Sequence, residues 1–66
     1  MNIIVNNNKH IVLENISVSD LLNTLNIELE YMAVEVNESI VPKSEYDHFK
    51  LQENDKIEII SAVGGG

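Results

Sequence analysis

The residues that could perform chemistry are sparse in this chain and form no recognisable catalytic set. His10 and His48 lie far apart, so no HxH or HxxxH metal spacing occurs. The serines have no histidine and carboxylate in a plausible triad arrangement. The chain has no cysteine, which excludes a disulfide, a thiolate nucleophile and a cysteine-based zinc site. These residues therefore predict no catalytic residue, no metal site and no bound cofactor.

The remaining unusual feature is the end of the sequence, where Gly64, Gly65 and Gly66 follow an apolar, β-prone run. Three extended residues reach about 10 Å, and residues without a Cβ atom can pass through a narrow channel. Such a tail would deliver the Gly66 carboxylate to another protein's active site, where joining it to AMP would make it an acyl donor. A mobile end without function is the alternative, and the tail alone leaves both open.

Length and charge restrict the class of protein and its partners. The 66 residues, 44% of them hydrophobic, predict one domain that is stabilised by packing. The net charge of −7 would repel a phosphate backbone or an anionic membrane, so we expect neither as a partner. It would attract a basic protein. Because the sequence shows no signal-type segment and no membrane-length apolar run, we expect a cytoplasmic protein, monomeric when free.

The elements that would position the tail can be read from the hydrophobic pattern. Residues 18–26 predict a helix with an apolar stripe, a capping box formed by Ser17 and Asp20, and a stop at Asn26. A turn at residues 6–8 joins two predicted strands, because Asn tolerates positive φ. The predicted strands span residues 2–6, 9–14, 32–37, 40–41 and 56–63, with a turn at Glu38 and Ser39 and a helical turn at 42–49.

Alternation along the strands separates a core face from an outer face. The predicted core face carries Ile3, Val5, Ile11, Leu13, Val34, Val36, Ile57 and Ile59, covered by the helix stripe Val18, Leu21, Leu22 and Leu25. The predicted outer face carries Asn2, Ile4, Asn6, His10, Val12, Ala33, Glu35, Glu58, Ile60 and Ala62. A partly apolar face without a helix is a candidate partner site. The residues that we expect to contact partners are Ile4, Val12, Glu58, Ile60 and Ala62.

The order of elements predicts an α+β domain over residues 1–63, followed by a flexible glycine tail at residues 64–66. We expect a mixed sheet of four to five strands with one helix packed on one face. If the last strand lies beside the first, the arrangement is the β-grasp, or ubiquitin-like, fold. Periodicity does not establish strand order, so this fold is one of several candidates at this point.

Four segments of the chain are "MNIIVNNN", "ISVSDLL", "VEVNESIVPKSEY" and "ENDKIEIISAVGGG". Together they resemble the ThiS family of sulfur carriers in thiamin thiazole biosynthesis. The third segment contains a V-P-[RK] motif, in which Lys43 stands where many members have arginine. The fourth segment matches the family's last strand and its terminal glycine pair, Gly65 and Gly66, whereas Gly64 is an extra glycine.

The resemblance implies a β-grasp fold and a role for the tail. An E1-like adenylating enzyme would use ATP and magnesium to adenylate the Gly66 carboxylate. Sulfur from cysteine, delivered by a desulfurase persulfide, would then convert it to a thiocarboxylate that thiazole synthase consumes. The chain would be a protein cosubstrate and not an enzyme. The alternatives are a sulfur carrier for molybdopterin synthesis, a ubiquitin-like modifier of lysines, and a binding module with an incidental tail.

Overall fold

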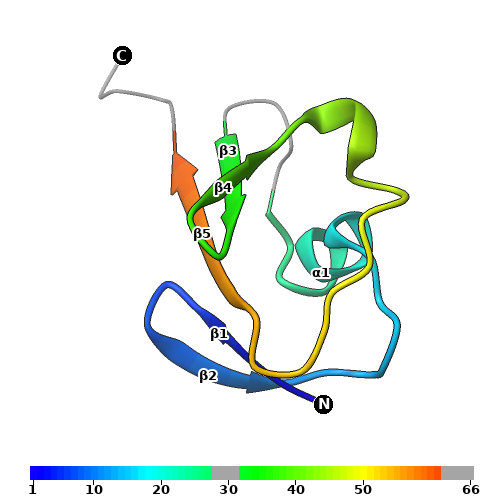
Figure 1. The fold of residues 1–66 in the computed structure, drawn as a ribbon, viewed down its shortest axis with the longest axis vertical. Helices are drawn as coiled ribbons and strands as arrows, with labels where there is room; N and C mark the ends of the chain where they lie inside the picture. The colour runs from blue at the N-terminus through cyan, green and yellow to red at the C-terminus, as the bar shows by residue number, and fades with distance from the viewer. Residues whose placement is uncertain (28–31, 62–66) are drawn as a thin grey trace.

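The computed structural model describes residues 1–27 and 32–61 (Figure 1). Its elements are β1 (Asn2–Val5), β2 (Asn8–Ile11), α1 (Val18–Thr24), β3 (Met32–Val36), β4 (Ser39–Val41), the 3₁₀ helix η2 (Lys43–Glu45) and β5 (Lys56–Ser61). The strands form one mixed sheet in the order β2-β1-β5-β3-β4. The apolar side of α1 packs on one face of this sheet. The predicted α+β class, with a mixed sheet and one helix, is confirmed.

Strand β5 occupies the centre of the sheet. It pairs in parallel with β1 at Ile4–Lys56 and Val5–Ile57. On its other edge it pairs antiparallel with the whole of β3, from Val36–Ile57 to Met32–Ser61. The last strand therefore lies beside the first, as the β-grasp arrangement requires. The central position gives β5 a hydrogen-bonding neighbour on both edges.

The helix α1 begins as the sequence predicts. The Ser17 side chain accepts a hydrogen bond from the Asp20 backbone N–H at 3.0 Å, and the Asp20 carboxylate accepts one from the Ser17 backbone N–H at 3.1 Å. These bonds hold the pKa of Asp20 below its ordinary value. The helix ends at Thr24, with Leu25 as C-cap and Asn26 at φ 57°. It is thus shorter than predicted, whereas the capping box and the stop residue are confirmed.

The hydrophobic core lies between α1 and the sheet. Ile3, Val34 and Ile57 have an exposed fraction of 0%, and they meet the buried helix residues Val18, Leu21 and Leu22. The predicted core members Val5 and Val36 are buried, while Ile59 and Leu25 are half-buried and pack against the core. Tyr46, in the predicted helical turn, is also buried in this core, and burial raises the pKa of its phenol.

The predicted faces of β2 are wrong. Ile11 and Leu13 were expected in the core, but their exposed fractions are 85% and 81%. The hairpin register pairs Ile3 with His10 and Asn2 with Ile11, so His10 lies on the core face and Ile11 on the outer face. The turn contains only Asn6 and Asn7, at φ 47° and 70°. Because the turn is one residue shorter than predicted, every β2 side chain changes face.

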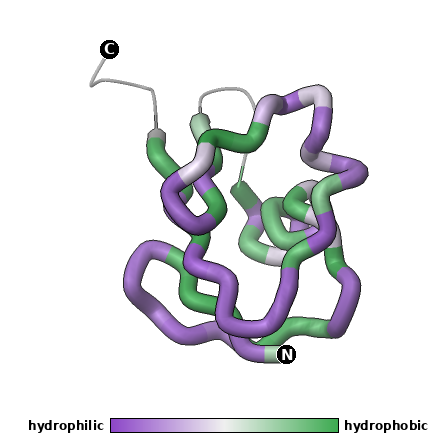
Figure 2. Tube along the Cα trace, in the orientation of Figure 1, coloured by the Kyte–Doolittle hydropathy of each residue, from purple (hydrophilic) through white to green (hydrophobic). Residues whose placement is uncertain are grey.

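Smaller differences concern the limits of the elements. The β3–β4 turn lies at Asn37 and Glu38, both at positive φ, one residue earlier than predicted, so β4 begins at Ser39. Strand β2 ends at Ile11 and not at residue 14. Figure 2 shows hydrophilic residues at the tip of the β1–β2 hairpin. The predicted boundary between domain and tail lies outside the described residues.

Candidate functional site

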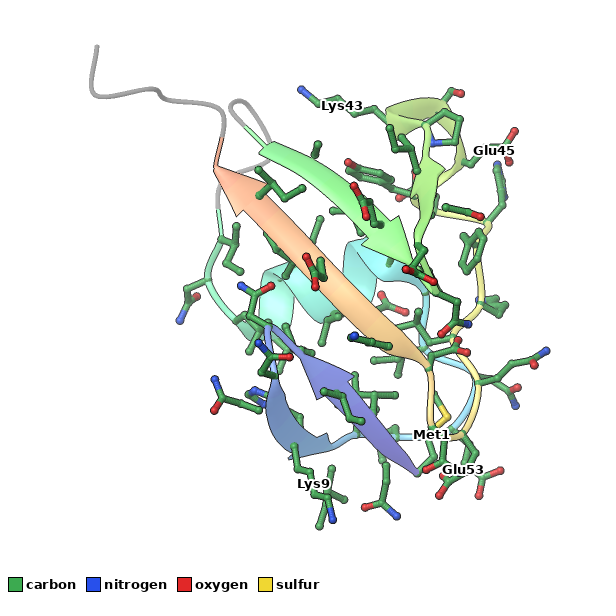
Figure 3. All side chains as sticks on the ribbon, turned by 60° about the vertical axis from the view of Figure 1, so that its left-hand side comes forward. Met1, Lys9, Lys43, Glu45 and Glu53 are labelled. Atoms are coloured by element: carbon green, nitrogen blue, oxygen red, sulfur yellow. The ribbon has the colours of Figure 1, made fainter. Side chains whose placement is uncertain are left out.

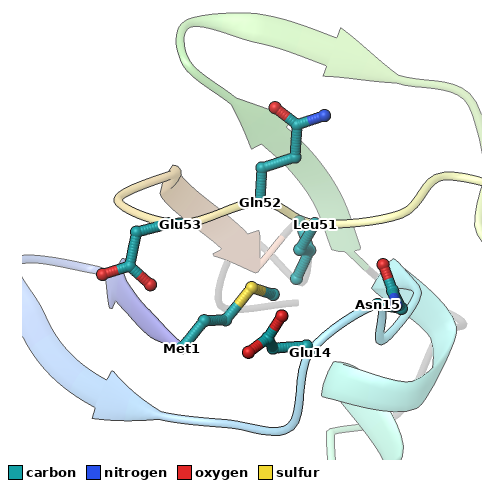
Figure 4. Close-up of a pocket in the computed structure, with 6 residues that line it drawn as sticks. All are labelled: Met1, Glu14, Asn15, Leu51, Gln52 and Glu53. Atoms are coloured by element: carbon teal, nitrogen blue, oxygen red, sulfur yellow. The ribbon is translucent and has the colours of Figure 1, made fainter.

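A shallow pocket of about 360 Å³ lies beside the start of β1 (Figure 4), and its lining residues are Met1, Glu14, Asn15, Leu51, Gln52 and Glu53. The Glu53 carboxylate accepts hydrogen bonds from the Asn2 backbone N–H at 2.8 Å and from Asn2 Nδ2 at 3.1 Å. These bonds lower the pKa of Glu53. Within residues 1–27 and 32–61, no group of three or more His, Asp or Glu side chains could hold a metal ion. The pocket therefore offers no catalytic arrangement.

The helix-free face of the sheet is the more prominent surface feature. We use this name for the side on which Ile60 pairs with Ala33 and Glu58 pairs with Glu35, across β5 and β3. Ile60 is 43% exposed. Ile40 of β4, which pairs with Glu35 of β3, is 70% exposed. On β1 and β2, Ile4 and Lys9 lie opposite each other, and Figure 3 shows Lys9 projecting from β2. The face therefore combines isolated aliphatic side chains with charges of both signs.

The structure brings together only some of the residues predicted to contact partners. Ile4, Glu58 and Ile60 lie on the helix-free face: Ile4 is half-buried, and the other two are exposed. The predicted outer position of Val12 is wrong, because this half-buried side chain packs against the core and its backbone N–H donates to the Met1 carbonyl at 2.9 Å. Ala62 and the tail residues Gly64, Gly65 and Gly66 lie outside the described residues.

The described end of β5 is held by a side chain from the first hairpin. The Ile59 backbone N–H donates to Asn6 Oδ1 at 2.8 Å, and Asn6 Nδ2 donates to the Ile59 carbonyl at 3.3 Å. The backbone N–H of Asn6 also donates to the Ile57 carbonyl at 2.9 Å. The sequence placed Asn6 at the end of the first strand, on the outer face, and in the turn that follows. Its second role escaped prediction because Ile59 lies 53 positions away.

The beginning of β5 is held in a similar way by Asn37. The Lys56 backbone N–H donates to Asn37 Oδ1 at 3.0 Å, and the Asn37 backbone N–H donates to the Lys56 carbonyl at 2.8 Å. Asn37 Nδ2 donates to Asp55 Oδ1 at 3.0 Å. Asn6 and Asn37 both follow a strand and both have positive φ. Together they hold β5, from which the glycine segment continues, at Lys56 and at Ile59.

Comparison with known proteins identifies the family. A family model described as the ThiS family matches residues 2–66. The chain belongs to the ThiS family. ThiS proteins are the sulfur carriers of thiamin biosynthesis. The match includes β5, its two anchoring asparagines and the glycine segment.

Individual ThiS proteins support this assignment. The sulfur carrier protein ThiS of Bacillus subtilis is 38% identical over 50 residues, which cover 76% of this chain and 76% of that protein. A crystal structure of the thiamine biosynthesis protein ThiS from Geobacter metallireducens has a TM-score of 0.88 and 30% identity, and each chain is covered completely. This likeness supports the β-grasp assignment.

One longer relative contains a region that is similar in sequence to this chain. Thiazole synthase of Paramagnetospirillum magneticum is 35% identical over 66 residues, which are the whole of this chain but 20% of that protein. This chain therefore spans about a fifth of the length of that relative.

None of the helices in the described residues has the length and apolar character needed to cross a membrane. The expected cytoplasmic location stays a prediction.

Proposed function

We propose that this ThiS-family chain carries sulfur as a thiocarboxylate on Gly66 and that thiazole synthase consumes this sulfur to build the thiazole ring of thiamin. The observation that carries the proposal is the family match over residues 2–66, which includes the glycine segment. The thiazole synthase relative that contains a region like this chain supports the choice of consuming partner. In this role the chain is a protein cosubstrate, regenerated after each transfer, and not an enzyme.

The chemistry begins with a carboxylate that must be activated. The Gly66 carboxylate attacks the α-phosphate of ATP, pyrophosphate leaves, and an acyl adenylate forms; the E1-like adenylating partner supplies the site for ATP and magnesium. A persulfide derived from cysteine by a desulfurase attacks the acyl carbon, and AMP leaves. A thiol then cleaves the resulting acyl disulfide, so a thiocarboxylate remains on Gly66 and the thiol becomes part of a new disulfide.

The helix-free face is the proposed docking surface for these partners. Ile4, Glu58 and Ile60 lie on it, and Ile60 precedes the glycine segment by only a few residues. An exposed aliphatic side chain gains most from burial against a complementary partner surface. The net charge of −7 favours a partner whose docking surface is basic around an apolar centre.

The test is an intact-mass measurement on the 66-residue protein after incubation with ATP, the adenylating enzyme, a desulfurase, cysteine and a thiol reductant. We expect the mass increase that results from replacing one oxygen with sulfur, and transfer of that sulfur when thiazole synthase and its substrates are added. The matched control lacks Gly65 and Gly66. It should fold identically by circular dichroism and gain no mass.

Other outcomes would support the alternatives. Full activity of the truncated protein would overturn the carrier mechanism and favour a binding module. Restoration of molybdoenzyme activity without relief of thiamin auxotrophy would favour the molybdopterin pathway. Conjugates linked through Gly66 to lysines in a denatured lysate would favour a protein modifier.

A further inference from the structure

The two neighbours of β5 end at different points along it. Strand β3 accompanies β5 to Ser61, whereas the parallel pairing with β1 ends at Val5–Ile57. The chain then turns away at Asn6 to form the hairpin. Beyond Ile57, the β1 side of β5 therefore presents backbone groups with no further β1 residue opposite them. Such an edge leaves backbone N–H and C=O groups without a partner from a neighbouring strand.

The Asn6 side chain occupies this position. Its carboxamide offers one acceptor and one donor to the Ile59 backbone, at 2.8 Å and 3.3 Å, in place of the backbone groups that a longer β1 would provide. With the bond from the Asn6 backbone N–H to the Ile57 carbonyl, the interaction continues the β1–β5 ladder past the end of β1. The side chain thus secures the edge that β3 does not cover.

The two tasks of Asn6 place narrow requirements on the residue type. Its φ of 47° is accessible to Gly, Asn and Asp but costly for most other residues. Glycine would make the turn but has no side chain to reach Ile59. Aspartate could accept from the Ile59 N–H but could not donate to its carbonyl when ionised. Among these three residue types, asparagine alone satisfies both the turn and the strand.

We propose that Asn6 is a positioning residue for the sulfur-carrying end: by fixing Ile59, it holds the part of β5 from which the chain continues toward Gly66. This inference rests on the proposed carrier function. Docking through the helix-free face brings the carrier to the adenylating enzyme, but the reaction also needs the carboxylate within reach of ATP. When the point at which a tether joins the domain is fixed, the effective concentration of the tethered group at its target rises. Loss of the bonds between Asn6 and Ile59 should therefore lower the turnover rate more than it weakens docking to the adenylating enzyme.

The experiment compares Asn6→Gly with Asn7→Gly. Both substitutions place glycine at a positive-φ position of the same turn, but only the first removes the bonds to Ile59. We expect Asn6→Gly, which removes both side-chain hydrogen bonds to Ile59, to lower kcat for adenylation of the carrier about fivefold, with KM for the carrier changed less than about twofold. We expect Asn7→Gly to change neither constant. Both assays are run at a temperature where circular dichroism shows fully folded protein.

Amide hydrogen exchange provides a readout that does not depend on the adenylating enzyme. In Asn6→Gly, the Ile59 amide should exchange several-fold faster, while the Ile57 and Val34 amides keep their protection. If Asn6→Gly does not fold, Asn6→Asp serves instead, because it retains the acceptor for the Ile59 N–H and should show a smaller change of the same kind. Faster exchange at all three amides would indicate general destabilisation and overturn the proposal.

The kinetic outcomes separate this inference from the proposed function. Equal losses in Asn6→Gly and Asn7→Gly would assign the effect to the turn and reject the anchor. A raised KM with unchanged kcat would place Asn6 in the docking surface and also reject it. If the native protein is not adenylated at all, the carrier mechanism fails, whereas altered exchange confined to Ile59 would still establish the anchor.

Discussion

The two faces of the sheet use isoleucine for different purposes. On the helix-covered face, Ile3 and Ile57 are completely buried against the core. On the helix-free face, Ile11, Ile40 and Ile60 remain largely or partly exposed. Because residue type and secondary structure are the same, the difference comes from α1, which covers one face only. Burial of an aliphatic side chain contributes to stability, whereas an exposed one leaves its burial energy available for a partner.

The largest loss of stability should result from a substitution that creates a cavity on the helix-covered face. Ile57→Ala removes a side chain with no exposed surface, and we expect the free energy of unfolding to fall by about 2–5 kcal/mol. Ile60→Ala is the matched control on the same strand but the opposite face, and it should cost less than about 1 kcal/mol. Urea denaturation of both variants measures the difference. Equal losses would contradict the distinction between the faces.

A smaller effect, on binding, should follow a charge on the helix-free face. Ile60→Glu should weaken binding to the adenylating enzyme about tenfold or more, because it buries a carboxylate where an aliphatic side chain would pack. Its circular dichroism spectrum should stay native. Isothermal titration calorimetry measures the affinity, with Ile11→Glu at the far edge of the same sheet as a control. Normal binding by Ile60→Glu would place the docking surface elsewhere.

The smallest effect should follow a polar substitution on the first hairpin. Ile11→Thr keeps a β-branched side chain at a position that is already solvated, so we expect the unfolding free energy to change by less than about 0.5 kcal/mol. Ile3→Thr, on the neighbouring strand, should cost considerably more, because it buries a hydroxyl group. Thermal unfolding of the pair measures the contrast. A large loss in Ile11→Thr would mean that Ile11 packs in the folded protein.

Local chemistry made much of this molecule predictable. The Ser17 and Asp20 capping box, the stop at Asn26 and the buried stripe of α1 depend on residues within one or two turns of each other, and all appear in the structure. The buried faces of β1, β3 and β5 also follow from simple alternation. The glycine segment alone left a carrier and a mobile end without function both open, and the family match supplies the pathway.

The tertiary structure decided the features that depend on register and on long-range contacts. A four-residue edge strand with Ile11 as its one aliphatic residue does not reveal which side faces the core. The two-residue turn pairs Val5 with Asn8, and this register determines which side of β2 faces the core. It leaves Ile11 exposed and directs Val12 toward the core. The anchoring of Ile59 by Asn6 likewise depends on the parallel pairing of β1 with β5. The sequence by itself determined the capped helix, the strand-rich core and the glycine end, because these depend on neighbouring residues. Only the folded sheet determined how β5 is held before that end, because that contact joins residues 53 positions apart.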